Sequence, residues 1–67
     1  MRTEFKDTSE KVIGTIECDN PELLLWIEGQ VIGKRVVTDG LDVWVASATV
    51  TDDDGTHVMD YEPRREP

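Results

Sequence analysis

Three kinds of side chain in this sequence could take part in chemistry: a run of acids, one histidine and one cysteine. The run is Asp52-Asp53-Asp54-Gly55, and carboxylates are ligands that calcium prefers. Calcium loops space their acids at alternate positions and add a bidentate Glu downstream, whereas these acids are contiguous and lack that Glu. We therefore expect a solvated turn here and no metal site.

The histidine and the cysteine show no catalytic pattern. His57 has no catalytic partner near it in the sequence, so we expect a half-exposed structural histidine. Cys18 is a lone thiol that cannot form an internal disulfide, and we expect it to be buried and inert. No Gly-rich phosphate loop or nucleophile motif is present. We therefore expect no catalytic residues, no cofactor and no enzyme activity.

The distribution of charge carries more functional content than any motif. The net charge is -8, and the stretch between Val36 and Pro63 holds seven acids and no Lys or Arg. Such a field repels nucleic acid and anionic membranes and attracts basic surfaces. The sequence therefore predicts a basic protein partner, with no direct nucleic-acid or membrane binding. The candidate partner-binding residues are the seven acids of this stretch: Asp39, Asp42, Asp52, Asp53, Asp54, Asp60 and Glu62.

The leading interpretation is a non-enzymatic acidic binding protein. By physical type it is similar to small acidic inhibitors that imitate the phosphate array of nucleic acid, as phage-encoded inhibitors of host defence often do. An alternative is a small halophilic homo-oligomer of structural or regulatory role, whose acids serve hydration, because Asp outnumbers Glu and Lys is scarce. A third interpretation is an antitoxin-like partner that wraps a basic toxin.

The length of the chain limits its stability. Sixty-seven residues make one small domain, and domains of this size bury only about 60% of their unfolded surface. One Cys and one His provide neither a disulfide nor the four ligands of a structural zinc site. Stability must then come from packing or from self-association, which predicts a homodimer. The lone thiol and the lack of a signal-like segment predict a cytoplasmic protein.

The N-terminal part predicts a β-hairpin followed by a helix. Residues 1–6 alternate between apolar and polar, and residues 11–18 form the returning strand, in which Gly14 suggests a bulge or a close backbone approach. Asn20 can cap a helix, and Pro21 suits its first position, which predicts a helix over about 21–32. The competing interpretation is a second hairpin over 23–37, because short apolar runs are ambiguous.

The predicted helix has two apolar faces. A broad arc at helical spacing is expected to face the core: Leu23, Leu24, Trp26, Ile27 and Val31. Leu25, Gly29 and Ile32 share a stripe on the other side, where two large apolar side chains would face water. Gly29 would let another backbone come close. This stripe is the candidate surface for self-association.

The C-terminal half predicts an antiparallel meander. Strand 41–51 is joined to strand 56–62 by the acidic turn, and pairing Thr51 with Thr56 sorts the hairpin into an apolar and a polar face. Ala46 and Ala48 then lie opposite Tyr61 and Met59 and leave a trough for the helix. In this register strand 41–51 separates acids 52–54 from the other four acids by roughly 30 Å.

The elements together predict an α+β fold in the order ββαβββ, with the helix packed on one face of the sheet. A small all-β barrel is the alternative. Residues 1–62 form the single domain, and residues 63–67 are expected to be a flexible tail.

Overall fold

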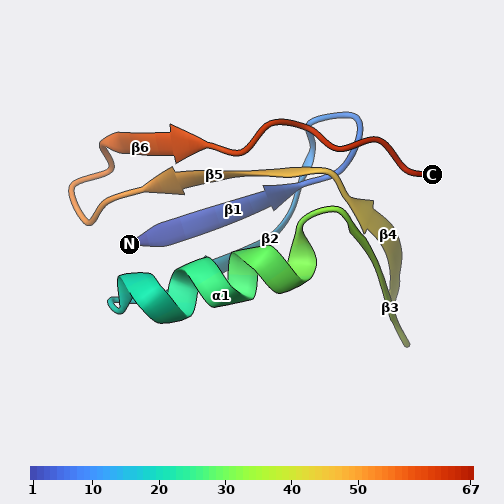
Figure 1. Ribbon diagram of the computed structural model, residues 1–67, viewed down its shortest axis with the longest axis horizontal. Helices are drawn as coiled ribbons and strands as arrows, with labels where there is room; N and C mark the ends of the chain where they lie inside the picture. The colour runs from blue at the N-terminus through green and yellow to red at the C-terminus, as the bar shows by residue number, and fades with distance from the viewer.

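The computed structural model describes residues 1–67 and has one helix and six strands. In chain order these are β1 (Arg2–Lys6), β2 (Val12–Glu17), α1 (Pro21–Val31), β3 (Lys34–Thr38), β4 (Leu41–Val45), β5 (Ser47–Thr51) and β6 (His57–Asp60). The predicted α+β fold is confirmed, and the sheets do not close into a barrel (Figure 1). The helix is too short to cross a membrane.

The strands form two antiparallel sheets. The larger has the order β2-β1-β5-β6, and the smaller pairs β3 with β4. The single strand predicted over 41–51 is divided at Ala46, where the chain passes from one sheet to the other. The N–H of Ala46 donates to the carbonyl of Lys6, and the N–H of Gly33 donates to the carbonyl of Val45, so both sides of this junction are held by backbone hydrogen bonds.

The two local predictions for the N-terminal half are confirmed. Pairing between β1 and β2 shifts between Phe5 and Lys6, which leaves Ile13 as the extra residue of a bulge beside Gly14. The side chain of Asn20 accepts hydrogen bonds from the N–H groups of Glu22 and Leu23, and Pro21 occupies the first helical position. The helix therefore forms where the cap predicts it, and the competing hairpin does not form.

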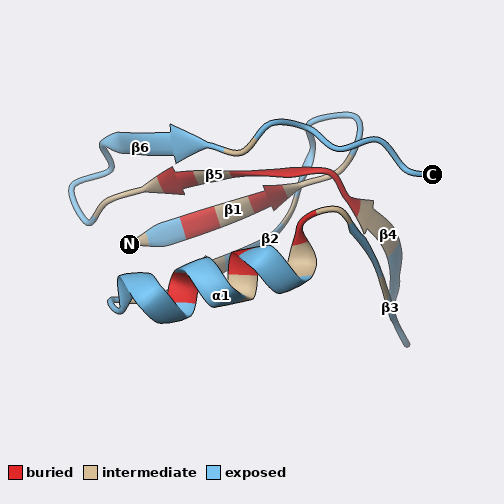
Figure 2. Ribbon diagram, viewed as in Figure 1, coloured by how far each residue is buried: buried red, intermediate tan, exposed pale blue.

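The helix packs with only part of the predicted face, since Leu24 is buried and Ile27 and Val31 pack against the core. Its buried residues are Leu24 and Glu28, whereas Leu23 is 48% exposed and Trp26 is 63% exposed. The placement of these two in the core is therefore wrong. The buried residues Leu24, Glu28 and Ile32 are spaced four apart, and Figure 2 shows the helix otherwise partly or fully exposed. The central position is a charged residue, whose carboxylate accepts hydrogen bonds from other parts of the chain.

The core is small. Ten of the 67 residues are buried, so little apolar surface is available to stabilise the fold. The main cluster joins Phe5 of β1, Val45 of β4, Ala48 of β5 and Ile32, which caps the helix at its C-terminal end. Ala48 of the predicted trough thus shares a core cluster with Ile32, the residue that ends the helix. Figure 2 shows the buried residues concentrated on β1 and β5, the two central strands.

The β5–β6 hairpin keeps its predicted faces, except at His57, but not its predicted register. Val50 pairs with Met59, two residues away from the predicted pairing, and a two-residue shift leaves each side chain on the same face. The pairing shifts again at Thr51, which pairs with His57. This irregularity moves His57 to the face that carries Asp60, whereas the predicted register placed these two on opposite faces.

The C-terminal residues have no secondary structure, but they are held at one point. The N–H of Arg64 donates to the carbonyl of Ala46, and the indole N–H of Trp44 donates to the carbonyl of Arg64. The side chain of Arg64 lies against Gly33, whose φ of 75° is readily adopted only by glycine. The predicted tail therefore docks against the junction between the two sheets.

Candidate acidic binding surface

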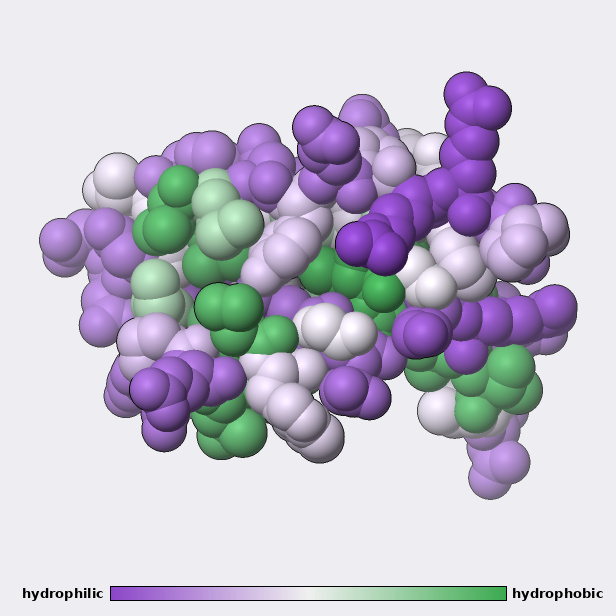
Figure 3. Space-filling view, viewed as in Figure 1, coloured by the Kyte–Doolittle hydropathy of each residue, from purple (hydrophilic) through white to green (hydrophobic).

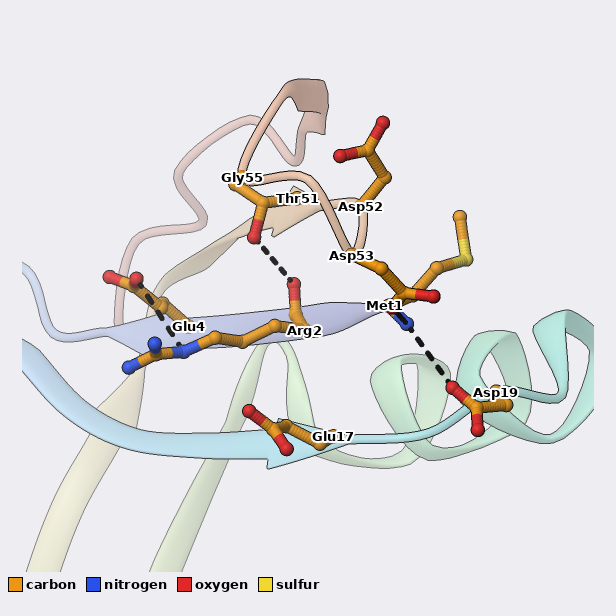
Figure 4. A pocket seen from close by; sticks show the side chains of 9 residues that line it. All are labelled: Met1, Arg2, Glu4, Glu17, Asp19, Thr51, Asp52, Asp53 and Gly55. Atoms are coloured by element: carbon orange, nitrogen blue, oxygen red, sulfur yellow. Dashed lines mark hydrogen bonds and ion pairs between the residues drawn. The ribbon is translucent and has the colours of Figure 1, made fainter.

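A groove of about 500 Å³ lies at the end of the larger sheet where β1 begins and the β5–β6 turn projects. Five carboxylates line it, together with the guanidinium of Arg2 and the N-terminal ammonium (Figure 4). The lining residues are Met1, Arg2, Glu4, Glu17, Asp19, Thr51, Asp52, Asp53 and Gly55. Acids therefore converge here from three segments that are far apart in the sequence.

The strand order brings these segments together. β1 is central, so Arg2 lies opposite Glu17 of β2 on one side and opposite Thr51 of β5 on the other. Glu4, Glu17 and Asp19 were not among the predicted residues, because they lie outside the stretch between Val36 and Pro63 that lacks Lys and Arg. The predicted N-terminal hairpin could have brought residue 17 beside residue 2. Nothing local in the sequence predicts the pairing of β1 with β5.

The three consecutive acids of the turn have different roles. Asp52 holds the turn, because its Oδ1 accepts hydrogen bonds from the N–H groups of Asp54 and Thr56 at 3.0 and 2.9 Å. Asp53 accepts a hydrogen bond from the N-terminal ammonium. The side chain of Asp54 makes no hydrogen bond or ion pair within the chain. Gly55, at a φ of 81°, completes the turn.

The N-terminal ammonium lies between two acids, as Figure 4 shows. Its nitrogen is 2.9 Å from Oδ1 of Asp53 and 3.7 Å from Oδ1 of Asp19. The hydrogen bond to Asp53 is the main reason why the pKa of this amine is raised above its usual 8.0. Both carboxylates remain largely exposed to water. The groove can therefore attract cations, but it has no dry interior of the kind that acid–base catalysis uses.

The acids at the other end of the molecule are partly neutralised. Asp42 on β4 accepts two hydrogen bonds from the guanidinium of Arg35, at 2.7 and 2.9 Å. The pKa of Asp42 is lowered, chiefly by this hydrogen bond. Asp39 lies in the β3–β4 turn, and Glu62 lies beyond β6. Neither of these two acids makes an ion pair. The predicted second group of acids is thus reduced to separate charges.

Asp60 belongs to a polar network on the uncovered face of the larger sheet. Lys6 donates to Thr49 Oγ1, and Thr49 donates in turn to Asp60 Oδ1, each at 2.8 Å. Nε2 of His57 lies 3.1 Å from the other oxygen of Asp60. The pKa of Asp60 is lowered chiefly by the hydrogen bond from Thr49 and, to a smaller extent, by that from His57. The histidine therefore has an acidic partner that the predicted register had placed on the opposite face.

The one buried acid of the chain is Glu28, which sequence reasoning assigned no role. It is 3% exposed, and its two oxygens accept hydrogen bonds from Thr3 at 2.8 Å and from Tyr61 at 2.7 Å. The pKa of Tyr61 is raised to about 12, chiefly by burial and, to a smaller extent, by the hydrogen bond to Glu28. Glu28 thus ties the helix to β1 and to the residue after β6. It is a structural acid and does not belong to the groove.

The predicted self-association stripe is only partly at the surface. Leu25 is 61% exposed, and the space above Gly29 is open, but Ile32 is 7% exposed and belongs to the core. The expectation that Ile32 faces water is therefore wrong. Trp26 takes its place as an exposed apolar residue of the helix. On the face shown in Figure 3, hydrophobic groups form separate patches among hydrophilic ones.

No group of three or more His, Cys, Asp or Glu residues is arranged to hold a metal ion. Cys18 is partly buried, and its thiol lies 3.5 Å from the carbonyl of Asn20. Comparison of the chain with protein-family models, with curated proteins and with solved structures found no match.

Proposed function

We propose that this chain is a non-enzymatic binding protein whose acidic groove docks against a basic protein surface. The supporting observation is the convergence of five carboxylates on one groove, although the acids come from separate parts of the sequence. Arginine side chains of a partner suit such a site, because a guanidinium binds carboxylates through two parallel hydrogen bonds. Arg2 and the ammonium limit repulsion among the acids without balancing their charge.

The overall charge density supports an imitation of nucleic acid. The net charge of -8 is spread over a longest dimension of 32 Å, which is about one charge per 4 Å. A single nucleic-acid strand carries one charge per roughly 3.4 Å, and a duplex carries twice that density. The protein therefore matches one strand better than a duplex. We propose that it competes with nucleic acid for the basic groove of a nucleic-acid-binding protein.

The proposal is tested by capturing partners from the extract of the native host. The groove variant changes Glu4→Gln, Glu17→Gln and Asp19→Asn, which leaves the turn cap of Asp52 and the ammonium contact of Asp53 intact. A matched control removes the same charge elsewhere, through the changes Glu10→Gln, Glu22→Gln and Glu66→Gln.

The parent and the control should capture the same basic partner at low salt, and the groove variant should lose it. The parent should also displace nucleic acid from the captured partner. Capture that is equal for all three proteins at every salt concentration would contradict the proposal.

The exposed helix face favours a second candidate function. A halophilic homo-oligomer would bury Leu25 and Trp26 between copies and use its acids for hydration. In that case the groove variant would keep all its partners but lose solubility or stability in molar salt, an outcome that separates the two candidates.

A further inference from the structure

The outer edge of β2 is unpaired, because this strand is the first in the order of the larger sheet. The N–H of Cys18 donates to the carbonyl of Met1, which makes these two residues a hydrogen-bonded pair. In an antiparallel ladder such pairs alternate, so the backbone groups of residues 14, 16 and 18 point towards β1. Those of Thr15 and Glu17 therefore point outwards, where another strand could bind them.

This edge lacks most of the features that usually prevent strand addition. Residues 12–17 include no Lys or Pro and a single charge, that of Glu17, and the bulge at Ile13 affects only the beginning of the strand. The opposite edge differs, since β6 has four residues and carries the charge of Asp60. β2 is thus the more accessible edge.

An apolar cavity of about 110 Å³ lies beside β2, on the face of the sheet that the helix covers. It is bounded by the edge strand, the end of the helix and the β3–β4 hairpin. The residues that line it are Phe5, Ile13, Gly14, Val31, Val36, Leu41 and Val45. Gly14 has no side chain to fill it, and a Cβ at this position would meet no atom within 4 Å. The cavity is of a size for one aliphatic side chain.

The cavity and the acidic groove lie on opposite faces of the sheet along the same strand. Gly14 pairs with Phe5 on the covered face, whereas Glu17 pairs with Arg2 in the groove. Successive side chains of a strand point to opposite faces, so two positions three residues apart face opposite sides. A strand added to β2 would place one side chain over Gly14 and another, three residues away, beside Glu17.

We propose that the edge of β2 binds an extended segment of the basic partner, with an apolar residue and a basic residue spaced three apart. The apolar side chain enters the cavity, and the basic one enters the groove. Backbone hydrogen bonds to Thr15 and Glu17 hold the segment, as in other cases of strand addition. The inference rests on the proposed function and specifies which feature of the partner is recognised.

A second copy of this chain suits the edge less well. Its own β2 contains no Lys or Arg, so it would bring no base to Glu17, and it would add a second net charge of -8. A basic segment supplies the missing charge. The complementarity of charge therefore favours a partner protein over self-pairing along this strand.

The test uses two fluorescein-labelled peptides of identical composition and charge. The matched peptide, Arg-Thr-Thr-Leu-Thr-Thr-Arg, has Arg three residues from Leu in both directions, so it fits in either strand orientation. The control peptide, Thr-Arg-Thr-Leu-Thr-Arg-Thr, places all three side chains on one face. Fluorescence anisotropy at low salt should give a Kd for the matched peptide that is lower by about tenfold.

Protein variants separate the edge from the charge. Thr15→Pro removes an outward N–H that β1 does not use, and it should weaken binding of the matched peptide by about tenfold or more, whereas Thr15→Val should not. Gly14→Val places a side chain at the cavity, where its Cβ would meet no atom within 4 Å. This variant should also weaken binding, which keeps the test valid if the proline variant fails to fold.

Equal affinity for the two peptides, or unchanged binding by Gly14→Val, would overturn the inference. If binding then depends only on salt and on the groove variant, the proposed function survives without strand recognition. If neither peptide binds, the inference is overturned, and capture from the extract still decides the proposed function. A dimer that Thr15→Pro dissociates in the absence of peptide would identify a second copy as the occupant and overturn the inference.

Discussion

The ionisation of Tyr61 tests the buried contact that ties the helix to the sheet. This is the chain's single tyrosine, so the near-ultraviolet absorbance of phenolate reports it alone. Its pKa is raised from 10.0 to about 12 by burial and by Glu28. A titration of the folded protein should therefore show phenolate appearing well above the pH at which the denatured chain shows it.

The same shift predicts a loss of stability in alkali. The folded state holds the phenol proton of Tyr61 more tightly than the unfolded state does. The resulting contribution to the free energy of unfolding is complete below pH 10 and is lost as the pH rises from 10 to about 12. A shift of about two pKa units corresponds to at most about 2.7 kcal/mol of stability. Because Tyr61 is only partly buried and water screens the interaction, we expect about 1 kcal/mol.

Two variants check the cause. Glu28→Gln removes the neighbouring charge and should lower the pKa of Tyr61 without returning it fully to 10.0, because burial is the larger cause. Tyr61→Phe should cost about 2 kcal/mol at neutral pH, as a hydrogen bond to a charged group is lost, and should remove this part of the alkaline transition. Urea denaturation at several pH values measures both effects. A tyrosine that titrates at the same pH in the folded and denatured chains would refute the contact.

Three further predictions concern packing, capping and association. Ala48→Leu should overpack the core beneath the helix and cost about 1–3 kcal/mol, and an unchanged melting temperature would show that the helix does not lie there. Asn20→Ala should cost about 1 kcal/mol and Asn20→Ser much less, as measured by urea denaturation, because serine retains a capping oxygen. Sedimentation at micromolar concentration should show a dimer that Leu25→Glu dissociates and salt strengthens, whereas a monomer at all concentrations would exclude the helix face as an interface.

The features that the sequence predicted are those with local causes. The cap at Asn20 and the proline after it define the start of the helix whatever the helix packs against. Alternation likewise placed Ala48 and Val50 on the buried face, although the pairing with β6 is shifted by two residues. A shift of two preserves the faces, so the pattern of side chains alone could not distinguish the two registers.

The features that the sequence missed depend on distant contacts. Glu28 is buried and Trp26 exposed because Thr3 and Tyr61 together satisfy a carboxylate that would otherwise be costly to bury. The acidic groove exists because β1 pairs with β5, a contact between strands that lie far apart in the sequence. Hydrophobic periodicity contains no information about either contact.

The groove as a cation-binding surface is the central claim, and a titration with hexa-arginine followed by amide NMR tests it most directly. We predict saturable shifts centred on Glu17, Asp19 and Asp53, which weaken steeply as salt rises because exposed charges are screened beyond ~8 Å at physiological ionic strength. Equal, non-saturating shifts at Asp39 and Glu62 would contradict the claim, because they would show that the acids act only as a diffuse charge.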